Sequence, residues 1–164
     1  MSRAELPPFQ TFLDEHRRPV LGLLRAMVGA DEVDDCFQET FMAALRAYPR
    51  AEGRNLRAWV LTIARRKAID HHRARARRPE PVAEPPALAA EQTRDGAGGG
   101  ELWARVAGLS PGQRSALALR FAADLPYREI GAALDCSEAA ARRRVHDGLE
   151  ALRERVATTK KEDL

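Results

Sequence analysis

The chain has 164 residues, of which 31% are charged and 5% are aromatic, and its formal net charge is +3. This length allows one or two domains, and the scarcity of aromatic residues argues against a large aromatic ligand pocket. The net charge is too small to predict nucleic-acid binding by itself, so the positions of the charges along the chain have to decide.

Segments that would direct the chain into or across a membrane are not evident in the sequence. No apolar run is long enough for a transmembrane helix, and the first residues, MSRAELPPFQ, lack the apolar core of a signal peptide. We therefore expect a cytoplasmic protein. Cys36 and Cys136 are far apart and neither lies in a CxxC motif, so both are expected to stay reduced, with structural or incidental roles.

Residues 1–78 have helical periodicity and form the first predicted domain. A helix that begins near Phe9 is expected to be interrupted or kinked at Pro19, which has no backbone N–H to donate. In the next helix, apolar residues recur at spacings of three and four and predict a buried stripe of Val33, Phe37, Phe41, Ala44 and Leu45. The opposite face is acidic and polar and consists of Asp34, Asp35, Gln38, Glu39 and Met42.

A turn-rich loop, residues 49–55, precedes a third predicted helix. The core stripe of this helix is expected to consist of Leu56, Trp59, Val60 and Ile63. At about 100° per residue, another third of its circumference carries the basic residues Arg65, Arg66, His72 and Arg73. Asp70 is expected to pair with Arg66 or Arg73, which lie three or four residues away along the same helix.

Residues 79–100 are rich in Pro at the start and in Gly at the end, and they contain more acidic than basic residues. They have little that could bury a face, so they are predicted to form a flexible linker. Residues 101–164 are predicted to form a second helical domain with a charged tail. There, Ser110 and Gln113 are spaced as a capping box, with Pro111 at the first helical position. The sequence thus predicts an all-α fold of two small domains on a tether.

The segment from Tyr127 to Val156 has the pattern of a helix-turn-helix. A short helix would end at Leu134, Asp135 would occupy the tight turn in a left-handed conformation, and Ser137 would cap the next helix. One side of that next helix is apolar and consists of Ala141, Val145, Leu149, Leu152 and Val156. Near its start, small residues alternate with basic ones, which lets a helix enter the major groove while arginines reach bases or phosphates. Two packed helices with a solvated arginine face are the alternative interpretation of this segment alone.

The segments DDCFQETFMAALRAY (residues 34–48) and LRAWVLTIARRKAIDHHRAR (residues 56–75) together resemble region 2 of bacterial RNA polymerase sigma factors of the extracytoplasmic-function group. Residues 101–156 are similar to region 4 of that family, with the helix-turn-helix in the expected place. The residues that agree with region 2 in type and spacing are Asp35, Gln38, Glu39, Phe41, Trp59, Ile63, Ala64, Asp70 and Arg73. The resemblance implies a protein that binds core RNA polymerase, directs it to promoters and helps to open the DNA.

The resemblance also implies which residues meet each partner. The face expected to dock on the clamp helices of the largest polymerase subunit consists of Asp34, Asp35, Gln38, Glu39 and Met42. Contacts to the minus-ten element would come from Arg54, Asn55, Arg65, Arg66 and Arg73. Contacts to the minus-thirty-five element would come from Arg120, Ala139, Ala140, Arg142, Arg143 and His146. An anti-sigma factor is a candidate further partner.

Two positions in region 4 depart from the family pattern. Asp147 stands where the family often has a basic residue, so a phosphate contact is not expected there. Ala140 and Ala141 replace a commoner Thr-Val pair, which removes a hydroxyl that could contact DNA.

In region 2, Trp59 lies on the apolar stripe, so it is expected in the core rather than on the DNA.

Two other classes of function fit parts of the sequence. A helix-turn-helix regulator that acts without polymerase would bind as a two-fold dimer, but no extra dimerisation helix is predicted and the linker would lack a purpose. An enzyme is disfavoured because the sequence has no HExxH, no Gly-rich phosphate loop before a helix, and no paired nucleophile and base. Since His71 and His72 point to different sides of a helix, they do not predict a metal site with Cys36. We therefore expect no catalytic activity, no cofactor and no metal.

Overall fold

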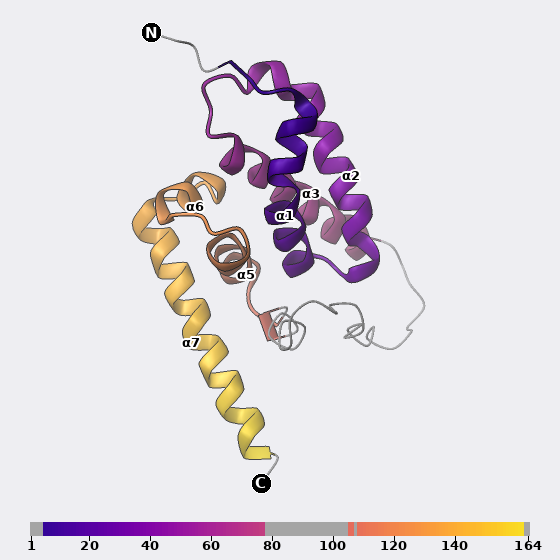
Figure 1. Cartoon of the computed structure of the whole chain (residues 1–164). Helices are drawn as coiled ribbons and strands as arrows, with labels where there is room; N and C mark the ends of the chain where they lie inside the picture. The colour runs from indigo at the N-terminus through magenta and orange to yellow at the C-terminus, as the bar shows by residue number, and fades with distance from the viewer. Residues whose placement is uncertain (1–4, 78–104, 107, 163–164) are drawn as a thin grey trace.

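The structure, a computed structural model, describes residues 5–77, 105–106 and 108–162. Within these residues the chain forms six α-helices, one 3-10 helix and one π-helix and has no strand (Figure 1), which confirms the predicted all-α class. The predicted linker, residues 79–100, lies outside the described residues. None of the helices in the described part is both long enough and apolar enough to cross a membrane.

The N-terminal half consists of α1 (Phe9–Met27), α2 (Ala30–Ala47), the 3-10 helix η1 (Tyr48–Arg50) and α3 (Leu56–Arg77). Of the two outcomes predicted at Pro19, the interruption is wrong, because α1 runs through this residue as one helix, and the kink stays a prediction. Pro19 leaves only the carbonyl of Glu15 without its usual donor, whereas the residues around it are held by packing. Phe12, Val20 and Leu23 are fully buried on the inner side of the helix.

An aromatic cluster around Phe12 forms the centre of this half. The Phe12 ring centroid lies 5.0 Å from that of Tyr48, 5.9 Å from that of Trp59 and 6.1 Å from that of Phe41. The Trp59 side chain therefore packs in the core, as the apolar stripe of α3 predicts. The hydroxyl of Tyr48 donates to the carbonyl of Pro7 at 2.7 Å, which ties the start of the chain to the same cluster.

The buried stripe predicted for α2 is confirmed except at its last member. Val33, Phe41 and Ala44 are buried and Phe37 is half-buried, but Leu45 is 48% exposed. At about 100° per residue, Leu45 lies about 120° around the helix from Val33, beyond the edge of the stripe. Leu45 therefore belongs to the outer surface of α2.

The C-terminal half consists of α5 (Pro111–Leu117), the π-helix η2 (Ala118–Ala122), α6 (Tyr127–Ala133) and α7 (Glu138–Glu162). The predicted capping box is present, since Gln113 N donates to Ser110 Oγ and Ser110 N donates to Gln113 Oε1, both at 3.4 Å. The helix-turn-helix is also present. Asp135 has φ 52° in its turn, and Ser137 Oγ accepts from the N–H of Ala140 at 3.1 Å.

The far end of α7 extends past the helices on which it packs (Figure 1). Ala141, Val145 and Leu152 of the predicted apolar side are buried, but Val156 is 44% exposed, so the prediction for that residue is wrong. Helical periodicity places a residue on a face, but it does not show how far the partner helices reach along that face.

The two halves are in contact in the structure. Helix α1 packs on η2 and α5, and α3 packs on α6. The contact between α1 and η2 is close at Gly22, where an added Cβ would lie 3.2 Å from the carbonyl oxygen of Ala122. Surfaces of the N-terminal half that face the C-terminal half are therefore covered. Two residues predicted to contact DNA, Asn55 and Arg65, lie at this contact.

We predict that Gly131→Ala destabilises the helix-turn-helix. A Cβ at Gly131 would lie 2.7 Å from Cys136 O and 3.2 Å from Ser137 C, so the backbone of the turn would have to move. We expect a loss of about 1–3 kcal/mol of unfolding free energy, as for other overpacked sites. Gly112→Ala is the matched control in α5, where an added Cβ meets nothing within 4 Å. That change should stabilise the protein by about 0.4–1 kcal/mol. Chemical denaturation of both variants is the measurement, and equal effects would contradict the prediction.

Candidate functional site

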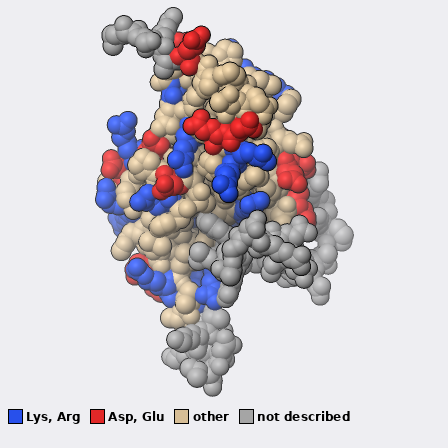
Figure 2. Space-filling model, in the orientation of Figure 1, with Lys and Arg blue, Asp and Glu red and all other residues tan. Residues whose placement is uncertain are grey.

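Charged side chains of both signs are interspersed on the face shown in Figure 2. No single-sign surface identifies a site on that face, so the candidate sites are located from the contacts of individual residues. Three of them can be built in this way: an acidic groove on α2, a basic side of α3, and the exposed side of the helix-turn-helix.

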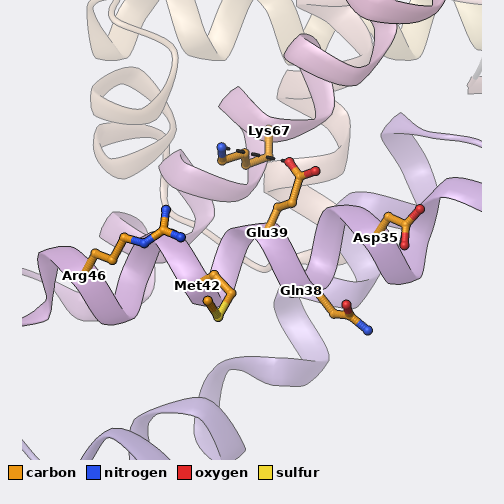
Figure 3. Close-up of a pocket in the computed structure, with 6 residues that line it drawn as sticks. All are labelled: Asp35, Gln38, Glu39, Met42, Arg46 and Lys67. Carbon is orange, nitrogen blue, oxygen red and sulfur yellow. Dashed lines mark ion pairs between the residues drawn. The ribbon is translucent and has the colours of Figure 1, made fainter.

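The predicted acidic face lies on α2 and borders an open groove of about 540 Å³ (Figure 3). The groove is lined by Asp35, Gln38, Glu39, Met42, Arg46 and Lys67. Asp34 is exposed beside it, so the structure brings all five predicted residues to one surface. Met42 is 52% exposed and Leu45 is 48% exposed, which adds apolar area to an otherwise polar surface.

Of the three acidic residues on this face, Glu39 alone forms ion pairs within the part of the chain that the structure describes. Its carboxylate lies 3.9 Å from Lys67 Nζ of α3 (Figure 3). It also lies 3.4 Å from Nε2 of His71 on the same helix. Asp34 and Asp35 make no ion pair with another residue in the part of the chain that the structure describes. The part of Lys67 in this surface could not be predicted from the sequence, because the contact depends on how α3 crosses α2.

Cys36 lies beneath the acidic groove and is fully buried. Burial, followed by the nearby carboxylates of Glu39, Glu32 and Asp35, raises the pKa of the Cys36 thiol to about 12. The thiol therefore stays protonated at neutral pH and behaves as a small core residue. Among the described residues, no group of three or more His, Cys, Asp or Glu side chains is placed to hold a metal ion.

The five residues predicted to contact the minus-ten element are divided by the structure into two sets. Arg54, Arg66 and Arg73 are exposed. Asn55 and Arg65 instead contact the C-terminal half. The first set is free to bind a phosphate or a base, whereas the second already has protein partners.

Asn55 and Arg65 each bond to α6. Asn55 Oδ1 accepts from the N–H of Ala58 at 3.1 Å, which caps α3, and Asn55 Nδ2 donates to Glu129 Oε1. Arg65 Nη1 donates to the carbonyl of Ala133 at 3.3 Å. Burial lowers the pKa of the Arg65 guanidinium, and nearby Arg144 and Arg66 lower it further.

Two further residues of α3 have contacts that the sequence did not predict. Arg57 Nη2 donates to the carbonyl of Ala123, so this residue joins the contact between the halves. The predicted pairing of Asp70 with Arg66 or Arg73 is absent among the described residues. A different arginine of α3, Arg75, forms an ion pair with Glu32 of α2 at 3.5 Å. His72, placed on the basic side by its position, bonds through Nε2 to the carbonyl of Met27.

The residues predicted to face upstream DNA lie together at the start of α7 and on η2. Ala139, Arg142, Arg143 and His146 are exposed, and Ala140 and Arg120 are half-buried. Two of the arginines have acidic neighbours on their own helix. Arg142 Nη2 lies 3.2 Å from Glu138 Oε1, and Arg143 Nε lies 3.7 Å from Asp147 Oδ2. Exposed pairs of this kind contribute about 0–1 kcal/mol, so DNA phosphates can replace them.

Comparison with known proteins gives a consistent result over both halves. Residues 12–78 match the profile of Sigma-70 region 2, and residues 99–152 match that of Sigma-70 region 4. The RNA polymerase sigma factor CarQ of Myxococcus xanthus is 34% identical over 154 residues, covering 89% of this chain and 87% of that protein. The ECF RNA polymerase sigma factor SigC of Mycobacterium tuberculosis is 31% identical over 149 residues, covering 87% and 80%.

Two solved structures resemble the whole arrangement. One is the sigma factor RpoE in complex with the anti-sigma factor NepR from Bartonella quintana, with a TM-score of 0.74, 25% identity, and coverage of 89% of this chain and 94% of that one. The other is CnrH in complex with the cytosolic domain of CnrY, with a TM-score of 0.71, 22% identity, and coverage of 92% and 88%. The second likeness concerns the fold alone.

We predict that a disulfide between the halves forms readily in Gly22→Cys/Ala122→Cys. An ideal Cβ at Gly22 lies 3.5 Å from the Cβ of Ala122, within the range of about 3.5–4.5 Å found in disulfides. The test uses a background in which Cys36 and Cys136 are replaced by Ser. Mild oxidation should give a faster-migrating band on a non-reducing gel, and the two single-cysteine variants should not. Failure of the double variant to close would mean that the halves are apart in solution.

Proposed function

Because the chain belongs to the extracytoplasmic-function group of RNA polymerase sigma factors, which direct the polymerase to promoters, we propose that its three candidate surfaces each serve one step of initiation. The acidic groove on α2 binds the clamp helices of the largest polymerase subunit. The basic side of α3 holds the separated minus-ten strand. The start of α7, together with Arg120, binds the minus-thirty-five element.

The acidic groove is the observation that carries the docking part of the proposal. Asp34 and Asp35 are unpaired among the described residues, and the exposed side chains of Met42 and Leu45 lie on the same helix. Acidic groups facing a basic partner steer association and fix its register. Met adapts its shape to an apolar contact. A merely solvated surface would not need two large exposed apolar side chains beside its acids.

We predict that Asp35→Lys/Glu39→Lys weakens binding to core polymerase by at least about a hundredfold, since like charges would then meet across the interface. The control is Glu150→Lys/Glu154→Lys on α7, which changes the net charge equally on exposed residues away from α2. Affinity is measured by titration with core enzyme, and circular dichroism checks that the helix content is unchanged. Native affinity in the first variant would overturn the assignment of this face.

Strand separation is proposed to depend on α3 and the loop before it. Extruding a base costs a few kcal/mol of stacking, which contacts to the base and to phosphates must offset. Arg66 and Arg73 are seven residues apart and therefore lie on one side of α3, where both are exposed. Arg54 is exposed in the preceding loop, near the position that an extruded base would occupy.

We predict that Arg66→Ala/Arg73→Ala leaves closed-complex binding largely intact and reduces open-complex formation. The two phosphate contacts become important only when a single strand is held against α3. The readout is permanganate reactivity of promoter thymines, with gel-shift measurement of total binding alongside. Arg17→Ala/Arg18→Ala on α1 is the control, because it removes the same charge from another exposed surface. Unchanged thymine reactivity in the α3 variant would contradict the proposal.

Asn55 and Arg65 can contribute to DNA binding only after the halves separate, because α6 now occupies their donors. We therefore predict that the oxidised Gly22→Cys/Ala122→Cys protein supports little transcription and that reduction restores it. Run-off transcription before and after dithiothreitol is the measurement. Full activity of the oxidised form would exclude Asn55 and Arg65 from the DNA interface.

Three further parts of the proposal follow from this role. An anti-sigma factor is the expected regulator, since the similar RpoE has been solved in complex with the anti-sigma factor NepR. The site of action is the cytoplasm, where the polymerase and the promoters are. The chain contributes binding and DNA opening, and the polymerase performs the chemistry of RNA synthesis.

A further inference from the structure

We propose that Tyr127 is a positioning residue for upstream recognition, whose ring holds the guanidinium groups of Arg120 and Arg142 in place before DNA binds. This inference rests on the proposed role of those two arginines in contacting the minus-thirty-five element. In the sequence, Tyr127 stands out only as the first residue of a short predicted helix.

The ring of Tyr127 contacts both arginines. The Cζ atom of Arg142 lies 4.6 Å from the ring centroid, and that of Arg120 lies 5.2 Å from it. Both distances are within the range of about 6 Å over which an aromatic face attracts a cation. Tyr127 is the first residue of α6, Arg120 belongs to η2 and Arg142 to α7. One ring therefore links the three elements that border the predicted DNA-binding surface.

Each arginine has a second contact that completes its orientation. Arg120 Nη1 donates to the carbonyl of Leu125 at 3.2 Å and lies 3.9 Å from Asp124 Oδ1. Arg142 Nη2 donates to Glu138 Oε1 at 3.2 Å. Without the ring, Arg142 would be held by that exposed pair alone, and a long side chain would then sample many rotamers. A side chain ordered before binding loses less entropy when it meets its base.

The ring attracts both positive charges, since the Cζ atoms of Arg142 and Arg120 lie 4.6 Å and 5.2 Å from its centroid. Each arginine also has a carboxylate beside it, Asp124 beside Arg120 and Glu138 beside Arg142. These contacts hold two positive charges near the start of α7, where the DNA contact is proposed.

The competing explanation is that Tyr127 acts through its hydroxyl. That group makes no hydrogen bond to another residue in the described part of the chain, so it could donate to a DNA phosphate. A phosphate contact weakens binding to all sequences alike, whereas misplacement of Arg142 weakens the preferred sequence most. The two explanations thus differ in whether sequence preference is lost.

The experiment measures binding of the full-length protein with core polymerase to a promoter with its native upstream element and to versions with single substituted bases. Tyr127→Phe keeps the ring and should retain the native preference. Tyr127→Leu removes it and should reduce the preference for the native element by about five- to thirtyfold, as expected for loss of two exposed cation–ring contacts. Tyr127→Met is a second non-aromatic variant, and thermal melting identifies the variants that remain folded.

A double-variant cycle with Arg142→Ala then decides the mechanism. If the ring acts through Arg142, Tyr127→Leu should have a smaller effect in the Arg142→Ala background than in the native one. Equal effects in the two backgrounds would overturn the positioning role while leaving base recognition by Arg142 intact. A uniform loss of affinity in Tyr127→Phe would also overturn it, in favour of a phosphate contact by the hydroxyl. If Arg142→Ala leaves the preference unchanged, the proposed role of Arg142 fails, and the positioning role fails with it.

Discussion

The packing around Phe12 is the constraint on which the arrangement of the N-terminal half depends. A fully buried ring on α1 touches rings of Phe41 on α2, Tyr48 on η1 and Trp59 on α3, which fixes these elements relative to one another. Because the three helices cannot rotate independently, Glu39 of α2 is held toward Lys67 of α3. The same packing turns Arg65 of α3 toward α6. The surfaces proposed to bind polymerase and DNA are thus positioned by one apolar core.

The contact between the halves uses the chemistry that DNA binding would use. Arg57 and Arg65 donate to the carbonyls of Ala123 and Ala133, which lie at the C-terminal ends of η2 and α6. Such carbonyls lack helical partners and carry partial negative charge, so they resemble phosphate oxygens as acceptors. These carbonyls do not satisfy every donor of the two guanidinium groups. The Nε atoms of Arg57 and Arg65 are buried without a hydrogen-bond partner among the described residues. A phosphate backbone could therefore replace these carbonyls without loss of hydrogen bonds.

Local signals in the sequence predicted the local structure well. The capping box at Ser110, the left-handed Asp135 and the cap at Ser137 each depend on a few neighbouring residues, and all three are present. Two local predictions failed, the interruption at Pro19 and the pairing of Asp70 along α3. The other errors concern the extent of a packing surface, which no short pattern contains. Leu45 and Val156 have helical spacing but lie beyond the edge or the end of the packing surface.

The candidate site was predictable to the same extent. The acidic face of α2 follows from one helix and its five residues do share a surface, although their binding to polymerase stays a prediction. Contacts between helices could not be predicted, because they depend on crossing angles that the sequence does not state. This is why Lys67, Arg57 and Glu129 were missed, and why Asn55 and Arg65 were expected to be free.

The positive charge of the exposed arginines at the start of α7 is partly offset by acids on the same helix. Arg142 and Arg143 each have an acid four residues away on the same helix, and Asp147 stands where a basic residue is usual in this family. Replacing such pairs by phosphates costs little each, but it lowers the affinity for DNA of any sequence. We therefore expect the isolated chain to bind DNA weakly, which suits a sigma factor that occupies promoters together with the polymerase. If polymerase docks on α2 and α7 binds the promoter, as proposed above, the local concentration of promoter DNA would offset that weakness. The acids on α7 would then help to make recognition depend on the polymerase.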